Sequence, residues 1–294
     1  MKVRLFNTEV QLNDDYCQLN SLEPLAVTEP YINLYVQSKG CNARCGFCEY
    51  QNIGNQFNLK KFENFLKQLS SEIKVRKISF TGGEPTLSYS NFHLRLEVAR
   101  EYLSESFFVV NTNGLNLKKL IASDDYLLLD SIALSRHAVS DEDNRSILGF
   151  NAPSENDLLS AIQSVENKEL FHFSCNIIKN YVDSESRVLE YLEWCSCLGI
   201  TDVGFVSLMA VNDFAKEHFV DFDSFNFEGN ERLVKTKIWN RKDSCRCNNY
   251  LYIPYNCENV VKVYNRYVYS KSGANNFVFD GEYFRKGFGG EIIY

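Results

Sequence analysis

The alternation of short apolar runs with longer helical patterns between residues 31 and 209 is the feature that most limits how this chain can fold. Six strands are predicted, at 31–38, 75–80, 107–111, 127–135, 171–178 and 202–209. Helical segments at 59–72, 91–104, 116–123, 154–166 and 185–197 separate them. Strands joined through helices take right-handed crossovers and form a parallel sheet. The pattern therefore predicts an α/β fold whose sheet is either barrel-like or open.

The rhythm changes after residue 210. Residues 211–244 are polar and irregular, and from residue 250 the chain is rich in β-branched and aromatic residues with turn signals such as Asp280-Gly281. We predict a small C-terminal β-rich appendage there. The expected organisation is an N-terminal segment at 1–30, a parallel α/β unit at 31–210 and an extension at 211–294.

Composition limits the classes of partner and the compartment. The net charge is −7, from 31 basic and 38 acidic residues, which argues against a nucleic-acid partner. The first thirty residues contain no apolar run typical of a signal peptide, and no segment reaches the length of a membrane span, so we expect a cytoplasmic protein without membrane contact. In that compartment the ten cysteines are not expected to form disulfides, and the clustered ones are expected to be metal or iron–sulfur ligands or reactive thiols.

Three cysteines, Cys41, Cys45 and Cys48, lie within eight positions directly after the first predicted strand. Three sulfurs are one ligand short of a closed tetrahedral site. Structural zinc usually takes paired knuckles, and none of the histidines stands at knuckle spacing from this loop; they are at positions 93, 137, 172 and 218. The spacing favours an iron–sulfur cluster over zinc, with reactive or buried thiols as a third reading.

A second motif, Thr-Gly-Gly-Glu-Pro-Thr-Leu at 81–87, follows the next predicted strand. Paired glycines let a backbone come close to a ligand and leave its polar groups free to hydrogen-bond. Taken alone, such a motif is more often an ordinary turn at the end of a strand.

Together the motifs resemble those of the radical S-adenosylmethionine (SAM) enzymes. The resemblance rests on Cys41-Asn-Ala-Arg-Cys45-Gly-Phe47-Cys48, on Gly82-Gly83-Glu84-Pro85 and, more weakly, on Asn-Thr-Asn-Gly at 111–114. It covers roughly residues 31 to 208. It implies a partial (βα)6 TIM-like barrel of parallel strands.

The resemblance also implies cofactors and a reaction. Cys41, Cys45 and Cys48 would hold three irons of a [4Fe–4S] cluster, and the fourth iron would bind the amino and carboxylate groups of SAM. The reduced cluster would cleave SAM to a 5′-deoxyadenosyl radical, which takes a hydrogen atom from the substrate. An electron donor such as flavodoxin or ferredoxin is the implied protein partner.

Site residues follow from the same resemblance. Gly82, Gly83 and Glu84 would hold the methionine amino group, and Phe47 would lie by the adenine. Contacts to the ribose or the carboxylate are expected from residues at strand C-termini, namely Asn111, Asn113 and Ser135. The residues do not identify a catalytic acid or base.

The segment Cys245-Arg-Cys247 with Cys257 resembles a reduced form of the auxiliary-cluster (SPASM/twitch-like) extension that many radical SAM enzymes carry. Its Cys-x-Cys-x9-Cys spacing departs from the usual Cys-x2-Cys, and no clear fourth cysteine follows. Cys195 or Cys197 could supply the fourth ligand, or substrate could take its place. The alternative is that these are ordinary thiols, because residues i and i+2 of a strand share a face without any metal.

The reaction subtype stays open at this point. The leading hypothesis is radical modification of a peptide or small metabolite. A glycyl-radical enzyme activase is the first alternative, and a zinc or iron–sulfur binding interaction module without SAM cleavage is the second. Only about thirty residues precede the first strand, so we expect neither a cobalamin domain nor a leader-peptide recognition domain ahead of it.

Overall fold

The computed structural model describes residues 1–12, 29–48, 57–235, 249–266, 275–288 and 290–294. The strands are β1 (Lys2–Leu5), β2 (Thr8–Gln11), β3 (Tyr31–Ser38), β4 (Lys74–Gly82), β5 (Phe107–Thr112), β6 (Ser131–Ser135), β7 (Phe171–Ile177), β8 (Asp202–Ser207), β9 (Leu233–Lys235), β10 (Asn249–Tyr252), β11 (Val261–Arg266), β12 (Asn276–Phe279) and β13 (Phe284–Lys286). The α-helices are α1 (Leu59–Glu72), α2 (Tyr89–Tyr102), α3 (Leu117–Ala122), α4 (Asp141–Leu148), α5 (Glu155–Gln163), α6 (Glu185–Cys197) and α7 (Asp213–Glu217), with 3-10 turns at Asp125–Leu128, Lys168–Leu170 and Phe222–Ser224.

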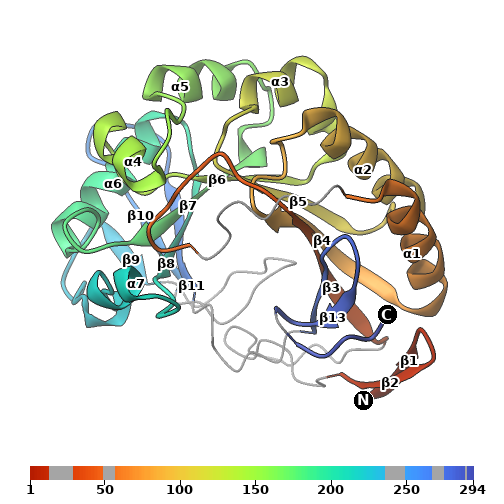
Figure 1. The fold of residues 1–294 in the computed structure, drawn as a ribbon. Coiled ribbons are helices and arrows are strands. Elements are labelled where there is room, and N and C mark those ends of the chain that lie inside the picture. The colour runs from red at the N-terminus through yellow and green to blue at the C-terminus, as the bar shows by residue number, and fades with distance from the viewer. Residues whose placement is uncertain (13–28, 49–56, 236–248, 267–274, 289) are drawn as a thin grey trace.

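The central element is a curved, mostly parallel sheet of eleven strands in the order β13-β12-β3-β4-β5-β6-β7-β8-β11-β10-β9. The six predicted strands, β3 to β8, lie side by side in chain order and pair in parallel. Helices α1 to α6 follow the outer side of this sheet (Figure 1). The prediction of an α/β fold with a partial barrel of parallel strands is confirmed.

Local sequence explains why these elements form. In α1, four apolar residues at helical spacing are fully buried, and the Asn58 side chain accepts a hydrogen bond from the Lys61 backbone N–H at the start of the helix. Helix α5 begins with a capping box between Ser154 and Asp157. No helix among the described residues is long and apolar enough to cross a membrane.

Two expectations about local structure need correction. The strand expected at 127–135 begins only at Ser131, because Asp125–Leu128 forms a 3-10 turn. Helix α4 was not expected, since only three of its eight residues are buried and its apolar pattern is correspondingly short. That helix matters for the site, because its C-terminal end contacts the cysteine loop.

The C-terminal residues add strands to both edges of the six-stranded unit. Strand β11 pairs in parallel with β8, and β12 pairs in parallel with β3. The Asp280-Gly281 turn joins β12 to β13 as an antiparallel hairpin, as its sequence indicates. The β-rich extension thus continues the main sheet, and eight consecutive strands from β12 to β11 run parallel.

The N-terminal hairpin β1–β2 packs beside the C-terminus of the chain, and both ends lie close together (Figure 1). The Phe6 ring stacks on Tyr294 at a centroid distance of 4.4 Å and on Phe65 of α1 at 5.5 Å. These ring contacts hold the turn of the N-terminal hairpin and the C-terminal residue against the same helix.

Candidate functional site

The C-terminal ends of β3 and β4 meet at the start of the cysteine loop. The Gly83 backbone N–H donates to the Ser38 carbonyl at 2.9 Å, and that of Glu84 donates to the Gly40 carbonyl, also at 2.9 Å. A Cβ atom at Gly83 would lie 1.9 Å from the Gly40 oxygen, and Gly82 has a φ of +99°. The two glycines are therefore required for the backbone of β4 to touch the chain that enters the loop.

Glu84 ties the β4 loop to the end of β5. Its buried carboxylate accepts hydrogen bonds from the Thr86 backbone N–H (2.9 Å) and hydroxyl (2.5 Å), from the Thr112 hydroxyl (2.7 Å) and from the Asn113 backbone N–H (2.8 Å). Burial raises the pKa of this carboxyl, while these donors act to lower it. Contact with a methionine amino group stays a prediction for Glu84, and in this structure its oxygens are used by the protein's own loops.

The thiols of Cys41, Cys45 and Cys48 are half-buried and form no disulfide with another described residue. The loop lies against the end of α4, where the Leu148 carbonyl accepts from the Arg44 backbone N–H at 2.8 Å and is 3.9 Å from the Cys45 sulfur. Burial raises the pKa of Cys45 to about 12 and also raises the pKa of Cys41. Without a metal these groups are protonated, so binding a metal centre must release their protons.

Asn113, at the end of β5, is turned toward the cysteine loop. Its Nδ2 lies 3.9 Å from the Cys41 sulfur and donates to the Asn42 Oδ1 at 2.9 Å. The Asn42 Nδ2 is buried and has no hydrogen-bond partner within the described part of the chain. Three closely spaced thiols beside a buried amide donor fit an iron–sulfur cluster, whose sulfur atoms accept hydrogen bonds.

Phe47 is held by the loops that follow β6, β7 and β8. It packs against a small apolar cluster made up of Ala138, Ile147, Ile178, Leu208 and Ala215. Its ring also meets the His137 ring edge-on at 5.4 Å. Burial, reinforced by the Arg136 charge, lowers the pKa of His137 to about 3, so this imidazole is neutral.

The other predicted nucleoside contacts lie on neighbouring strands. The Asn111 Nδ2 donates to the Ser79 hydroxyl of β4 at 2.7 Å, and Ser135 is the half-buried last residue of β6. Neither has a hydrogen bond to the described part of the cysteine loop, residues 39–48, and their contact with SAM stays a prediction. Sequence reasoning missed two residues of the site, Thr86, which donates to Glu84, and Asn42, which accepts from Asn113. Both lie within the two motifs, but the spacing of a motif does not show which atoms of another loop a side chain will contact.

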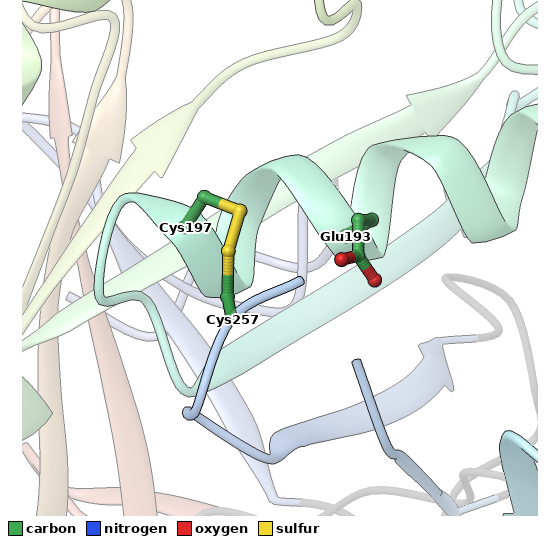
Figure 2. Close-up of side chains that lie close together, drawn as sticks. All are labelled: Glu193, Cys197 and Cys257. Atoms are coloured by element: carbon green, nitrogen blue, oxygen red, sulfur yellow. A yellow bond between two sulfur atoms is a disulfide. The ribbon is translucent and has the colours of Figure 1, made fainter. Parts of the chain in front are cut away.

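Two further cysteines form a disulfide. Cys197, the last residue of α6, is bonded to Cys257, with a Cα–Cα distance of 5.3 Å (Figure 2). The expectation that no cysteine forms a disulfide is wrong for this pair, because the turn after β10 brings residues 60 positions apart together. Cys195 is a free thiol buried in the core and is not part of this group. Cys245 and Cys247 lie outside the described residues.

Glu193, one turn before Cys197, lies with both sulfurs in a group whose ligand atoms are within 4.8 Å of one another (Figure 2). Its carboxylate accepts hydrogen bonds from the Tyr252 hydroxyl (2.7 Å) and from the Tyr255 and Asn256 backbone N–H groups (2.8 and 2.7 Å). Because the sulfurs are bonded to each other and the carboxylate is occupied, the group as it stands anchors the β10–β11 turn to α6 rather than offering a metal site.

Solved structures share this fold. The structure of Streptococcus suis SuiB bound to S-adenosylmethionine aligns with 63% of this chain and 42% of its own, at a TM-score of 0.50 and 20% sequence identity. That of anSMEcpe with bound AdoMet aligns with 63% of this chain and 55% of its own, at a TM-score of 0.51 and 17% identity. At these identities the likeness concerns the fold alone.

Sequence relatives carry a more specific name. A protein of Saccharolobus islandicus strain Y.N.15.51, called probable GTP 3′,8-cyclase, is 27% identical over 221 residues, which are 74% of this chain and 66% of that protein. A protein of the same name from Sulfolobus acidocaldarius is 24% identical over 225 residues, 75% of this chain and 68% of its own. The chain spans about two thirds of the length of these relatives.

The family profile described as the radical SAM superfamily matches residues 35–223, from within β3 to the turn that follows α7. This range contains the three cysteines of the loop, Gly82 to Glu84 and Asn113. Enzymes of this superfamily use a [4Fe–4S] cluster and SAM, and these residues are the ones that meet at the ends of β3, β4 and β5. The chain belongs to the radical SAM superfamily.

Proposed function

We propose that this protein reductively cleaves SAM and uses the 5′-deoxyadenosyl radical to take a hydrogen atom from a peptide or small-metabolite substrate. One observation carries the proposal: the loop that contains Cys41, Cys45 and Cys48 begins where the Gly83 backbone N–H donates to the Ser38 carbonyl, and the Asn113 amide lies 3.9 Å from the Cys41 sulfur, so the cysteine motif meets the residues that follow β4 and β5. When bound, the [4Fe–4S] cluster and SAM supply the electron and the radical precursor. Family membership sets aside the reading of a non-enzymatic metal-binding module.

The chain's own residues would divide the remaining work. Cys41, Cys45 and Cys48 would hold the cluster, and Gly82 and Gly83 would let the end of β4 pack directly against the chain that leads into the cysteine loop. Phe47 is held firmly by the apolar cluster beneath it and would present its ring to the adenine. The closing of the site against water would fall to the loops after β6, β7 and β8, which already contact this ring.

The inner face of the sheet supports a polar substrate. In β7, Phe173 and Cys175 belong to the core between sheet and helices, so the alternate residues Ser174 and Asn176 face the other side, where both are half-buried. Asn111 faces the same side from β5 by the same alternation. Amide and hydroxyl groups on this face could hydrogen-bond a nucleotide, a sugar or a peptide backbone.

The comparisons support the small-metabolite version more than the peptide version. The relatives named probable GTP 3′,8-cyclase match in sequence over about three quarters of this chain. A structure of SuiB bound to its precursor peptide SuiA matches in fold alone. A nucleotide is accordingly the substrate class to test first. Activation of a glycyl-radical enzyme stays the alternative.

A second iron–sulfur cluster at Cys245, Cys247 and Cys257 also remains a proposal. The Cys257 sulfur is bonded to Cys197, so ligation of iron would require two electrons and two protons from a dithiol reductant to open that bond. Once opened, Cys197 rather than Cys195 would be the nearest additional thiol. A flavodoxin or ferredoxin is the proposed electron donor to the first cluster.

The test is anaerobic reconstitution, followed by iron and sulfide counting and an assay for 5′-deoxyadenosine after dithionite reduction. We expect about four irons from a [4Fe–4S] cluster and deoxyadenosine formation that depends on SAM. Iron beyond that number, found only after dithiol treatment, supports the second cluster. Bound metal without deoxyadenosine would overturn the proposed function. Substrate classes are then compared by how far a nucleotide or a peptide increases SAM turnover.

A further inference from the structure

The orientation of two side-chain amides in the cysteine loop follows from one backbone group. The Leu115 N–H donates to the Asn113 Oδ1 at 3.1 Å, which leaves the Asn113 Nδ2 as the end that faces the loop. Because that group is a donor, Asn42 must present its oxygen to it, and the observed 2.9 Å contact joins these two atoms. The Asn42 NH2 group is thereby turned away from Asn113.

The same geometry places donors around the Cys41 sulfur. It faces two N–H groups, the Ala43 backbone at 3.4 Å and the Asn113 Nδ2 at 3.9 Å. Both groups are donors, so the Cys41 side of the loop is equipped to stabilise added negative charge.

The Asn42 NH2 group has a donor to offer and nothing in the described part of the chain to receive it. A buried amide nitrogen without a partner costs free energy unless a ligand satisfies it. Asn42 lies between Cys41 and Ala43, so an acceptor bound by the three cysteines is the group that its position can reach. Sulfur atoms of an iron–sulfur cluster are such acceptors.

Asn113 is fixed in place from the opposite side. Its backbone N–H donates to Glu84, whose carboxylate is itself held by Thr86 and Thr112. The Gly-Gly-Glu motif therefore positions a side chain that reaches the cysteine loop. Asn113 thus links the end of β5 to the cysteine loop, because its Nδ2 lies 3.9 Å from the Cys41 sulfur.

We propose that Asn42 and Asn113 are positioning residues that place N–H donors on the Cys41 side of the cluster and thereby raise its reduction potential. The inference rests on the proposed function, because it requires the cluster to be present. Reduction adds negative charge to the cluster, and N–H groups aimed at its sulfur atoms stabilise the reduced form more than the oxidised form. The two asparagines make the first electron easier to deliver.

The test is the midpoint potential of the reconstituted cluster, measured by EPR-monitored titration without SAM and again with SAM. Asn42→Ala removes the unpartnered donor without adding charge, Asn42→Asp replaces that donor by an oxygen, and Asn113→Leu removes the other donor. Asn116→Ala is the matched control, because its amide donates to the Thr86 carbonyl in the same region without touching the cysteine loop. Iron content is measured for each variant.

We expect the potential to become more negative in the order wild type, Asn42→Ala, Asn42→Asp, with Asn113→Leu also shifted and Asn116→Ala unchanged. An unshifted potential in Asn42→Ala with full iron content would overturn the inference for Asn42, and an equal shift in Asn116→Ala would assign the effect to a loosened loop. A shift seen only with SAM would mean that the donors act on SAM. If Asn113→Leu fails to retain iron, the Asn42 variants decide. A wild-type protein that binds no cluster would defeat the proposed function instead.

Discussion

Two groups of cysteines lie at the ends of secondary-structure elements in this protein, and they are built in opposite ways. In the loop after β3, three half-buried thiols form no disulfide with another described residue, and the Asn113 amide lies beside the first of them. At the end of α6, two sulfurs are bonded to each other, and the nearby Glu193 carboxylate is occupied by the β10–β11 turn. The sulfurs of the first group are available as metal ligands, whereas those of the second are bonded to each other.

The difference shows that cysteine count is a poor guide to metal binding without the surrounding donors and acceptors. The loop sulfurs are presented by a turn that the Gly83 and Glu84 backbone holds in place. The α6 pair instead joins segments that are distant in the chain, and its effect is to limit how far the unfolded chain can expand. One group suits chemistry and the other suits anchoring.

The largest effect is expected from a substitution in the open group, by which we mean Cys41, Cys45 and Cys48; the disulfide of Cys197 and Cys257 is the closed group. Cys45→Ala should reduce 5′-deoxyadenosine formation to background, because it would remove one of the three proposed protein ligands to the cluster. Cys257→Ala should retain most uncoupled SAM cleavage, since its sulfur is remote in sequence and bonded elsewhere. Both are measured by chromatography after dithionite reduction. Equal losses in the two variants would show that the division into an open and a closed group is wrong.

The next effect tests the backbone contact that supports the open group. In Gly83→Ala the new Cβ would lie 1.9 Å from the Gly40 oxygen, so the loop must move. We expect a loss of about 3 kcal/mol or more in the free energy of unfolding, together with loss of iron. Gly229→Ala is the control, because a Cβ atom added to that exposed glycine would meet no other atom within 4 Å. Its φ of +77° is then the only source of strain for alanine, at about 1–2 kcal/mol. Denaturant titration and iron counting compare the two, and similar costs would refute the close-contact argument.

A third measurement concerns the closed group. Oxidised protein should be more stable than dithiothreitol-treated protein by about 2–4 kcal/mol, because the Cys197–Cys257 bond restricts the unfolded chain. Cys197→Ser should abolish that difference, whereas Cys195→Ser, two residues away in the same helix, should preserve it at a lower overall stability. Urea titrations with and without dithiothreitol give the values. Two free thiols at these positions in oxidised protein, found by mass spectrometry, would contradict the assignment.

The smallest effect is a loss of stability in acid that comes from His137, which packs against Phe47 of the cysteine loop. The folded-state pKa of His137 is about 3, against an ordinary value of 6.5, so as pH falls below 6.5 protons bind the unfolded chain and favour unfolding. At pH 5 this cost is about 2 kcal/mol, and above pH 7 it vanishes. His137→Gln should lose less stability than wild type between pH 7.5 and pH 5. Parallel stability profiles for the two proteins would contradict a neutral, buried His137 beside Phe47.

The sequence predicted the elements with strong periodicity well. Strand β3 and helices α1 and α6 have the bounds expected from their apolar spacing. The cysteine loop and the Gly-Gly-Glu motif were also correctly located at strand ends, because the C-terminal ends of neighbouring parallel strands meet at one edge of a sheet. Helix α4 was missed, since only three of its eight residues are buried and its apolar pattern is correspondingly short.

Pairings between distant segments could not be read in the same way. Strands β11 and β12 lie at opposite edges of the parallel sheet, and nothing in their alternation says which partner each will take. The disulfide joins residues 60 positions apart for the same reason. Asn42 drew no attention in the sequence, because its value depends on an unpartnered nitrogen that only the packed loop reveals.

By itself the sequence determined that three thiols follow a buried strand and that a glycine pair follows the next one, since covalent spacing and apolar periodicity are local properties. Only the tertiary structure decided that Glu84 accepts a hydrogen bond from the Asn113 backbone and that the Asn113 amide lies beside the Cys41 sulfur. It also decided that Cys257 forms a disulfide with Cys197. Those contacts depend on the register of strands and on loop geometry, which arise when segments far apart in the chain pack together.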